Sequence, residues 1–183
     1  MIEGKNIYLR IMELEDMDCY REMINTPEIA DKVVGWGFPV SKEAQIEWYK
    51  RAINDDRNKR FTIILKESME PVGMVTLSGI DWHNRSATHG IKLHPSCPKG
   101  KGIGTDAVMT LMKYAFEEVN LNRLDGSWME DNIPSEKLYL KCGWVVEGVK
   151  KNAIFRNGKY HNLKITGIQK DAYYTVKEKL GWE

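Results

Sequence analysis

The chain has 183 residues, 42% of them hydrophobic, which suits one globular domain with a single core. Lysine and arginine number 27 and aspartate and glutamate 26, so the formal net charge of +1 favours neither a nucleic acid nor an anionic membrane as a partner. No stretch approaches the roughly 18 apolar residues of a membrane span, and the residues after Met1 include no signal-peptide core. We therefore expect a single domain over residues 1–183, located in the cytoplasm.

The cysteines are Cys19, Cys97 and Cys142, an odd number that cannot pair completely. None lies in a CxxC motif or at a spacing from histidine that suits zinc. We expect reduced thiols and no metal site.

Hydrophobic spacing in the first half of the chain predicts a strand, two helices and a hairpin. Pro27 is expected to end the first helix, and Ser41 to cap the second. The predicted strands are 7–11, 61–66 and 72–77, and the predicted helices are 13–25 and a helix from Ser41 through Ala52.

The second half of the chain alternates strands with helices. Its clearest element is an amphipathic helix over 103–119, where apolar residues recur at helical spacing. The order of elements indicates one mixed α/β domain without repeats or linkers. The other predicted helices are 134–141 and 171–180, and the predicted strands are 87–94, 123–128, 144–149 and 160–166.

A glycine-rich loop lies between the strand that ends near His94 and the helix that begins near Ile103. Its glycines occupy alternate positions, with lysines between them, in the sequence Lys99-Gly100-Lys101-Gly102-Ile103-Gly104-Thr105. Glycines let backbone N–H groups approach an anion closely, and a helix N-terminus adds partial positive charge. The loop therefore predicts a phosphate-binding site.

Three interpretations of this loop compete. It could be an ordinary glycine turn, although a turn does not require alternate glycines and two lysines. It could bind a dinucleotide, since the residues from Gly102 to Ala107 fit G-x-G-x-x-A and Asp125 follows about twenty residues later. Several predicted strands precede the loop, however, and a proline-containing segment separates it from its own strand. The third interpretation is a coenzyme A site.

The loop resembles the coenzyme A signature of the GCN5-related N-acetyltransferases, the GNAT family, which reads Q/R-x-x-G-x-G/A at a strand-to-helix turn. Lys99 stands where the family has glutamine or arginine, which keeps the positive charge and loses a bidentate contact. The resemblance implies a GNAT-like fold, with a central twisted mixed sheet of about six to seven strands flanked by helices. It also implies main-chain contacts from Ile91, Lys92 and Leu93 to pantetheine.

A second stretch, from Asn132 to Trp144, resembles the family pattern N-x-x-S-x-x-x-Y-x-K-x-G-[FW]. The resemblance implies that Asn132 binds the pantetheine amides and that Tyr139 gives a proton to the departing thiolate. By position alone, Tyr139 could instead be a core aromatic. The residues expected to bind acetyl-coenzyme A are Ile91, Lys92, Leu93, Lys99, Gly100, Lys101, Gly102, Ile103, Gly104, Thr105, Asn132, Ser135 and Lys137.

The general base and the acceptor site are harder to assign. Relatives often carry a glutamate on the strand before the loop, where this chain has Thr88, so His89 is our catalytic candidate for the base, with Asp81 as another. Trp36, Glu47 and Asp81 are candidates for an acceptor groove that attracts a cationic amine.

The resemblance extends over most of the chain to the branch that acetylates ribosomal-protein N-termini and polyamines. It implies acetyl-coenzyme A-dependent transfer to a primary amine by direct attack, with a protein N-terminus or a small molecule such as a polyamine as acceptor. A homodimer is common in the family. The alternatives are a non-catalytic coenzyme A sensor, motivated by the missing strand glutamate, and the dinucleotide-binding protein.

Overall fold

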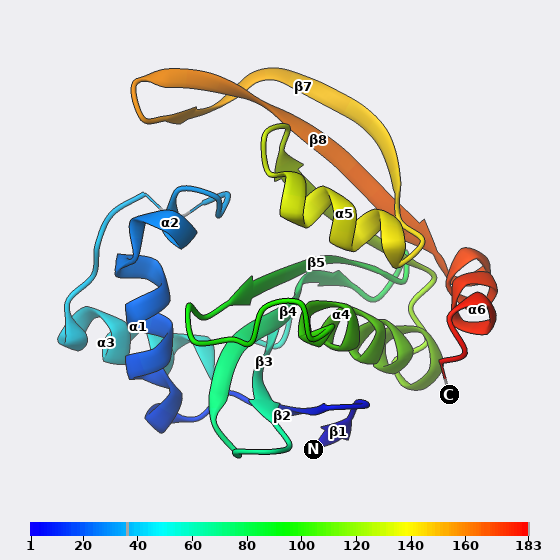
Figure 1. Cartoon of the computed structure of the whole chain (residues 1–183), viewed down its shortest axis with the longest axis horizontal. Coiled ribbons are helices and arrows are strands. Elements are labelled where there is room, and N and C mark those ends of the chain that lie inside the picture. Colours follow the sequence, from blue (N-terminus) through cyan, green and yellow to red (C-terminus); the bar gives the residue numbers. More distant parts are fainter. Residues whose placement is uncertain (36, 183) are drawn as a thin grey trace.

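A computed structural model describes residues 1–35 and 37–182; the predicted acceptor residue Trp36 lies outside the described residues. One mixed sheet has the strand order β1-β2-β3-β4-β5-β6-β8-β7 (Figure 1). Neighbouring strands are antiparallel except β5 and β6, which are parallel. The strands are β1 (Ile2–Glu3), β2 (Ile7–Ile11), β3 (Lys59–Leu65), β4 (Pro71–Asp81), β5 (Ser86–Leu93), β6 (Arg123–Met129), β7 (Val145–Arg156) and β8 (Lys159–Gln169).

The predicted fold class is confirmed, and the described residues form eight strands where six or seven were expected. The additional strand is β1, whose two residues are too few for hydrophobic alternation to reveal; Ile2 pairs with Leu9 of β2. The last two strands are also longer than predicted. They form a hairpin whose tip residues, Asn157 and Gly158, have φ values of 50° and 77°, which matches the left-handed turn that suits a tight hairpin.

Two of the helices begin at residues that suit a helix start. Ser41 Oγ accepts a hydrogen bond of 3.1 Å from the Ala44 N–H at the start of α3. Pro27, expected only to end a helix, also begins a short one, because proline fits the first helical position. The helices are α1 (Met17–Asn25), α2 (Pro27–Ala30), α3 (Lys42–Ala52), α4 (Ile103–Lys113), α5 (Ile133–Lys141) and α6 (Lys170–Lys179), with a 3₁₀ turn η1 (Leu14–Asp16) before α1 and a π-helical turn η2 (Tyr114–Glu118) after α4.

The sheet carries a separate core on each face, because successive side chains of a strand point to opposite sides. On β4, Val75 packs in the larger core with α4, whereas Met74 packs with Tyr20 and Met23 of α1 and with Trp48 of α3. The helices α1 and α3 therefore cover one face of β4, and α4 covers the other face of β4 and β5.

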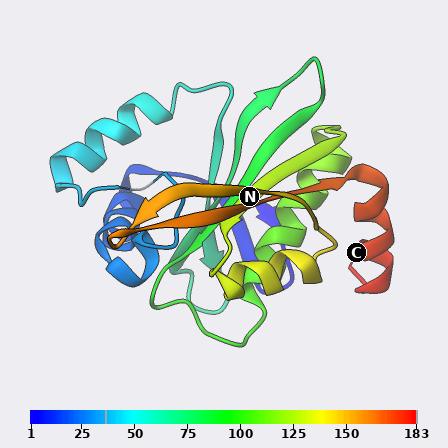
Figure 2. The same ribbon diagram turned by 90° about the horizontal axis from the view of Figure 1, so that it is seen from above.

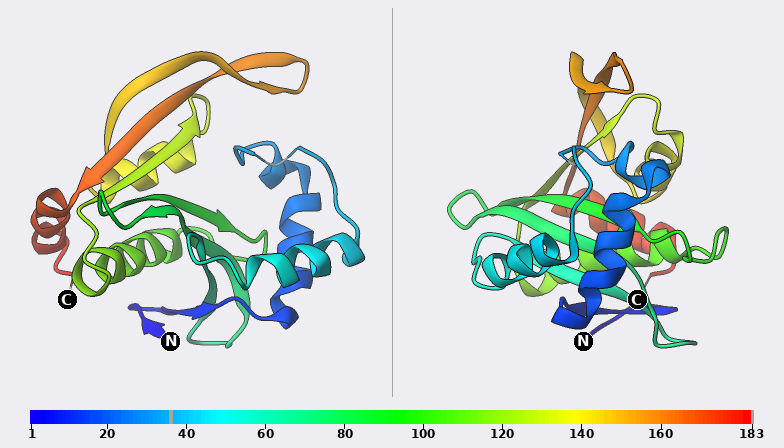
Figure 3. Two further views of the ribbon diagram at one scale, coloured as in Figure 1. Left: turned by 180° about the vertical axis from the view of Figure 1, so that it is seen from behind. Right: turned by 90° about the vertical axis from the view of Figure 1, so that its left-hand side faces the viewer.

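The parallel strands β5 and β6 separate soon after they start. Within the described chain, their pairing runs only from Ser86–Arg123 to Thr88–Asp125. The hairpin β7–β8 passes above α5 in Figure 1 and crosses over the rest of the sheet in Figure 2. The turn of this hairpin lies at the opposite end of the molecule from both termini, whereas the other end of β8 leads directly into α6 and the C-terminus (Figure 3). The separation of β5 and β6 leaves main-chain groups of both strands available to a ligand.

Candidate active site

A cavity of about 870 Å³ lies where β5 and β6 separate, and it reaches both faces of the sheet. We call the two ends the α4–α5 half and the α2 half. The α4–α5 half is lined by the glycine loop, by Ile103 and Gly104 of α4, and by Asn132, Ser135, Leu138 and Tyr139 at α5. The α2 half is lined by Thr26, Glu28, Ile29, Lys32, Val33 and Val34 near α2, by Thr76 and Ser78 of β4, and by Thr88, Gly90 and Lys92 of β5.

The loop glycines serve two different purposes. Gly100 and Gly102 have φ values of 72° and 77°, in the left-handed region, and a Cβ on either would meet nothing within 4 Å. Gly104 instead permits close packing, because its Cβ would lie 3.3 Å from Leu138 Cδ2. The N–H groups of the first turn of α4 lack partners within the helix. A loop with open space above it and a helix N-terminus behind it fits a pyrophosphate.

Tyr139 lies on α5 with its ring enclosed by aromatic side chains and its hydroxyl against β5. The ring stacks on Trp128 at a centroid distance of 5.2 Å and meets Trp144 edge-on at 5.0 Å. Its hydroxyl is 2.9 Å from His89 Nδ1. Tyr139 is therefore both a core aromatic and a wall of the cavity, so the two interpretations of this residue are compatible.

Burial sets the protonation states of this pair. Desolvation raises the pKa of Tyr139 well above its usual value, so the hydroxyl keeps its proton at neutral pH. Desolvation, assisted by the charge of Lys92, lowers the pKa of His89 to about 3. A histidine with such a pKa is neutral at pH 7 and is a weak base.

Asn132 links the second motif to the start of α5. Its side-chain Oδ1 accepts a hydrogen bond of 3.3 Å from the Ser135 N–H and caps the helix. Asn132 is buried and lines the cavity. Because Oδ1 is used by the cap, the amide NH₂ group is the part of this side chain that suits a ligand carbonyl.

The structure brings most of the predicted cofactor residues to the cavity wall. His89 and Tyr139 also lie there. Other predicted residues lie elsewhere: Glu47 is exposed on α3 and pairs with Lys50 at 2.6 Å, while Asp81 accepts hydrogen bonds from His83 and Asn84 in a turn. The predicted site residues that line the cavity are His89, Ile91, Lys92, Leu93, Lys99, Gly100, Gly102, Ile103, Gly104, Asn132, Ser135 and Tyr139; those that do not are Glu47, Asp81, Lys101, Thr105 and Lys137.

Sequence reasoning missed most of the α2 half. Thr76 and Ser78 of β4 lie opposite Gly90 and Thr88 of β5, so their hydroxyls share one face of the sheet. Polar residues at alternate positions of a predicted interior strand were the available signal. Lys32 could not be assigned from sequence, because α2 had not been predicted.

Comparison with known proteins agrees with this geometry. Residues 6–145 match the family model described as the acetyltransferase (GNAT) domain. The chain belongs to the GNAT acetyltransferases. Over 92% of its length it is 29% identical to the uncharacterized N-acetyltransferase p20 of Bacillus licheniformis, covering 96% of that protein. Over 88% of its length it is 30% identical to spermidine N(1)-acetyltransferase of Escherichia coli K12, covering 85% of that protein.

A solved structure supports the same assignment. The spermidine N-acetyltransferase of Vibrio cholerae, in complex with CoA and spermine, superposes with a TM-score of 0.85 at 26% identity, covering 92% of this chain and 98% of that one. As a GNAT enzyme, this protein carries out acetyl-coenzyme A-dependent amine acetylation. Neither the sensor nor the dinucleotide alternative gains support, and a dinucleotide fold needs a parallel sheet that this topology does not provide.

No helix in the described part of the chain is long and apolar enough to cross a membrane. Over residues 1–35 and 37–182, no group of three or more His, Cys, Asp or Glu side chains could hold a metal ion.

Proposed function

We propose that this GNAT enzyme transfers acetyl by direct attack of a neutral primary amine on the thioester of acetyl-coenzyme A. Tyr139 donates a proton to the leaving thiolate and regains one, through water, from the acylated nitrogen, so that the C–S bond breaks as the C–N bond forms. The observation that carries the proposal is the Tyr139 hydroxyl, held 2.9 Å from His89 at the point where β5 and β6 separate. There it lies between the α4–α5 half, which suits coenzyme A, and the α2 half, which remains for the acceptor.

The α4–α5 half has the groups that coenzyme A requires. The loop from Lys99 to Gly104 and the N-terminus of α4 would hold the pyrophosphate. The unpaired edge of β5 beyond Thr88 would offer main-chain groups of Ile91 and Leu93 to the pantetheine amides. The Asn132 amide would supply a further donor. Lys99 would act as a point charge in place of the family's usual side chain.

The hydrogen bond between His89 and Tyr139 determines which way the phenol proton points. His89 is neutral, and among the described residues its Nε2 has no hydrogen-bond partner. A buried N–H without a partner is rarer in proteins than a buried acceptor without one. The tautomer with hydrogen on Nδ1 is therefore favoured, so His89 donates to the Tyr139 oxygen. The tyrosine hydrogen is then free to point into the cavity towards sulfur.

This arrangement gives His89 a role different from the predicted general base. With a pKa of about 3 it is a poor proton acceptor at neutral pH. We assign it as a positioning residue that orients the Tyr139 hydroxyl.

The acceptor would enter through the α2 half. The spermidine acetyltransferases among the relatives support a small-molecule amine, and a protein N-terminal amine is the second candidate. We also propose that the enzyme is cytoplasmic and uses no metal cofactor. The three free cysteines favour the cytoplasm, because a reducing compartment keeps thiols unpaired. The proposal also includes a homodimer, as is common in the family.

Release of free coenzyme A thiol with a panel of amines tests the proposal, together with calorimetric titration of acetyl-coenzyme A. We expect binding and amine-dependent thiol release. Binding without turnover on polyamines, amino sugars, amino acids and peptides would overturn the catalytic proposal in favour of a sensor.

A further inference from the structure

Lys92 occupies an unusual place in the α2 half of the cavity. It pairs with Met74 of β4, so its side chain projects from the face of the sheet that α1 and α3 cover. A Cβ placed on Gly90 would lie 3.7 Å from Lys92 Nζ and 2.9 Å from Thr76 Oγ1. The lysine therefore folds back along its strand, and Gly90 leaves the space between the ammonium and the hydroxyl open.

The charges of this half are positive on balance. Glu28 is the one carboxylate among the described lining residues of the cavity, whereas Lys32 and Lys92 both line the α2 half. Burial and the Arg60 guanidinium lower the pKa of Lys92 to about 8, which still leaves the amine mostly protonated at pH 7. A second ammonium group entering this space would be repelled.

We propose that the acceptor is a short primary amine that carries an anionic group, carboxylate or phosphate, bound above Gly90 by the Lys92 ammonium and the Thr76 hydroxyl. The inference rests on the proposed function and narrows its acceptor class. It separates this enzyme from the spermidine acetyltransferases that it resembles, whose named substrate is a polycation.

The geometry also limits the length of the acceptor. His89, the partner of the proton donor Tyr139, precedes Gly90 directly in β5, and a strand rises about 3.3 Å per residue. Successive side chains of a strand point to opposite faces, so the space above Gly90 and the Tyr139 hydroxyl lie on opposite sides of β5, and the acceptor must be long enough to span that strand. γ-Aminobutyrate, whose amine and carboxylate are separated by three methylene groups, is the first acceptor to test.

The inference is tested by comparing kcat/KM for acceptors of equal length. Putrescine, butylamine and γ-aminobutyrate share a four-carbon chain and differ in the charge at the far end. Repulsion between two like charges about 6 Å apart, at an effective dielectric constant near 20, raises the dissociation constant roughly 100-fold. We expect γ-aminobutyrate to exceed putrescine by at least about tenfold, and aminopropyl phosphate shows whether phosphate is accepted as well as carboxylate.

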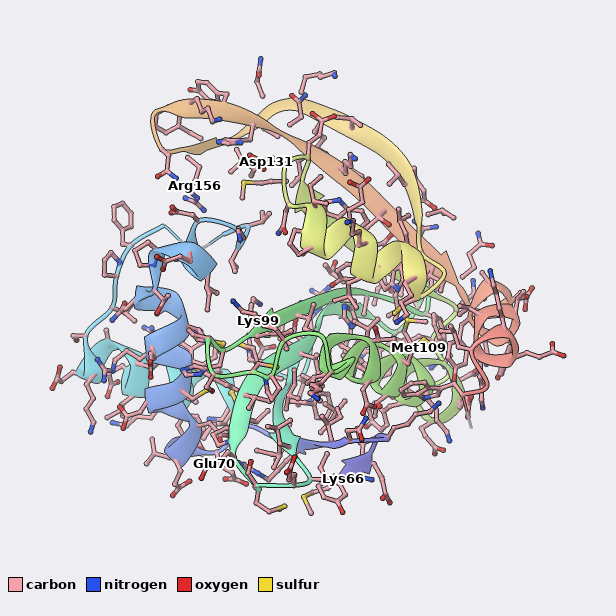
Figure 4. All side chains as sticks on the ribbon, in the orientation of Figure 1. Lys66, Glu70, Lys99, Met109, Asp131 and Arg156 are labelled. Atoms are coloured by element: carbon pink, nitrogen blue, oxygen red, sulfur yellow. The ribbon has the colours of Figure 1, made fainter. Side chains whose placement is uncertain are left out.

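Variants at position 92 assign the preference to the lysine. Lys92→Met should reduce the ratio of γ-aminobutyrate to putrescine activity at least about tenfold, and Lys92→Glu should invert it. Lys92→Arg should keep the preference, and Lys92→Glu provides the test if the neutral variant does not fold. The matched control is Lys66→Met, which removes a lysine paired with Glu3 at the β3–β4 turn, far from Lys99 of the glycine loop (Figure 4).

The outcomes separate the two proposals. If the wild type prefers putrescine or spermidine, or if Lys92→Met leaves the ratio unchanged, the anionic acceptor is wrong while acetyl transfer stands. If acetyl-coenzyme A binds and no amine is acetylated, the proposed function itself is wrong.

Discussion

Replacing Tyr139 with phenylalanine removes one oxygen from the cavity and leaves the ring packing in place. The ring keeps its contacts with Trp128 and Trp144, but His89 Nδ1 loses its hydrogen-bond partner. An unsatisfied buried polar group costs about 1–3 kcal/mol. A change of 1 kcal/mol shifts the melting temperature of a domain of this size by roughly 2–4 °C. Losing a general acid costs roughly 10²–10⁴-fold in rate.

Steady-state thiol release and thermal denaturation measure these two effects separately. The matched control is Tyr173→Phe, because Tyr173 is fully buried and donates to Glu117 at 2.7 Å away from the cavity. Both variants should melt at a lower temperature, but only Tyr139→Phe should lose kcat, with its affinity for acetyl-coenzyme A nearly unchanged. A kcat for Tyr139→Phe within a few-fold of wild type would refute the role of Tyr139 as proton donor.

Three further variants test neighbouring parts of the site. The pKa of His89 is about 3 in the folded protein and 6.5 in the free side chain, so between these values only the unfolded state gains a proton, and the free energy of unfolding falls as the pH decreases. In urea titrations, His89→Gln should remove about 2 kcal/mol of the stability that the wild type loses between about pH 7 and pH 5. An unchanged pH dependence would contradict the burial of His89 as a neutral side chain. Gly102→Val places a branched residue at φ 77°, which costs about 1–3 kcal/mol of backbone strain, and its side chain fills the space above the loop. Calorimetry should therefore show weaker binding of acetyl-coenzyme A, and intact affinity would count against the pyrophosphate site. Asn132→Asp keeps an oxygen to cap α5 and removes the amide donor, so the dissociation constant should rise at an unchanged melting temperature, whereas a drop in melting temperature alone would indicate a purely structural role.

The α4–α5 half of the cavity, which we propose binds coenzyme A, was predictable because its residues are contiguous in sequence. The residues of the glycine loop all lie in one strand-to-helix turn, and those of the Asn132–Trp144 stretch lie in one helix and the segment that leads to the next strand. Gly100 and Gly102 are required by local backbone conformation, which acts over a few residues. Lys101 and Lys137 lie within the same motifs but do not line the cavity, because a motif fixes the backbone more firmly than each side-chain direction.

The α2 half could not be predicted because it is assembled by tertiary contacts. Thr76 meets Gly90 only through the register of β4 against β5, and Lys32 reaches the cavity only because α2 lies beside it. Glu47 was proposed for an acceptor groove because its charge would attract a cationic amine, but its side chain is exposed and pairs with Lys50. The packed core determines strand register and helix rotation, so the local spacing of residues does not predict them.

His89 shows where sequence and structure give different chemistry. A histidine beside an expected glutamate position suggests a base, and only its burial against Tyr139 and Trp144 shows that its pKa is too low for that task. The aromatic contacts come from α5 and the segment after it, about fifty residues along the chain.

Direct transfer is tested by following the acetyl group itself. Cys97 lines the cavity, and burial raises the pKa of its thiol, so it is a poor nucleophile at neutral pH. With isotopically labelled acetyl-coenzyme A, we predict that mass spectrometry finds one labelled N-acetyl amine for each coenzyme A released, that no label remains on the protein when the acceptor is omitted, and that Cys97→Ser retains activity. Label on the protein that later passes to the amine, or coenzyme A release without an acetylated amine, would contradict direct transfer.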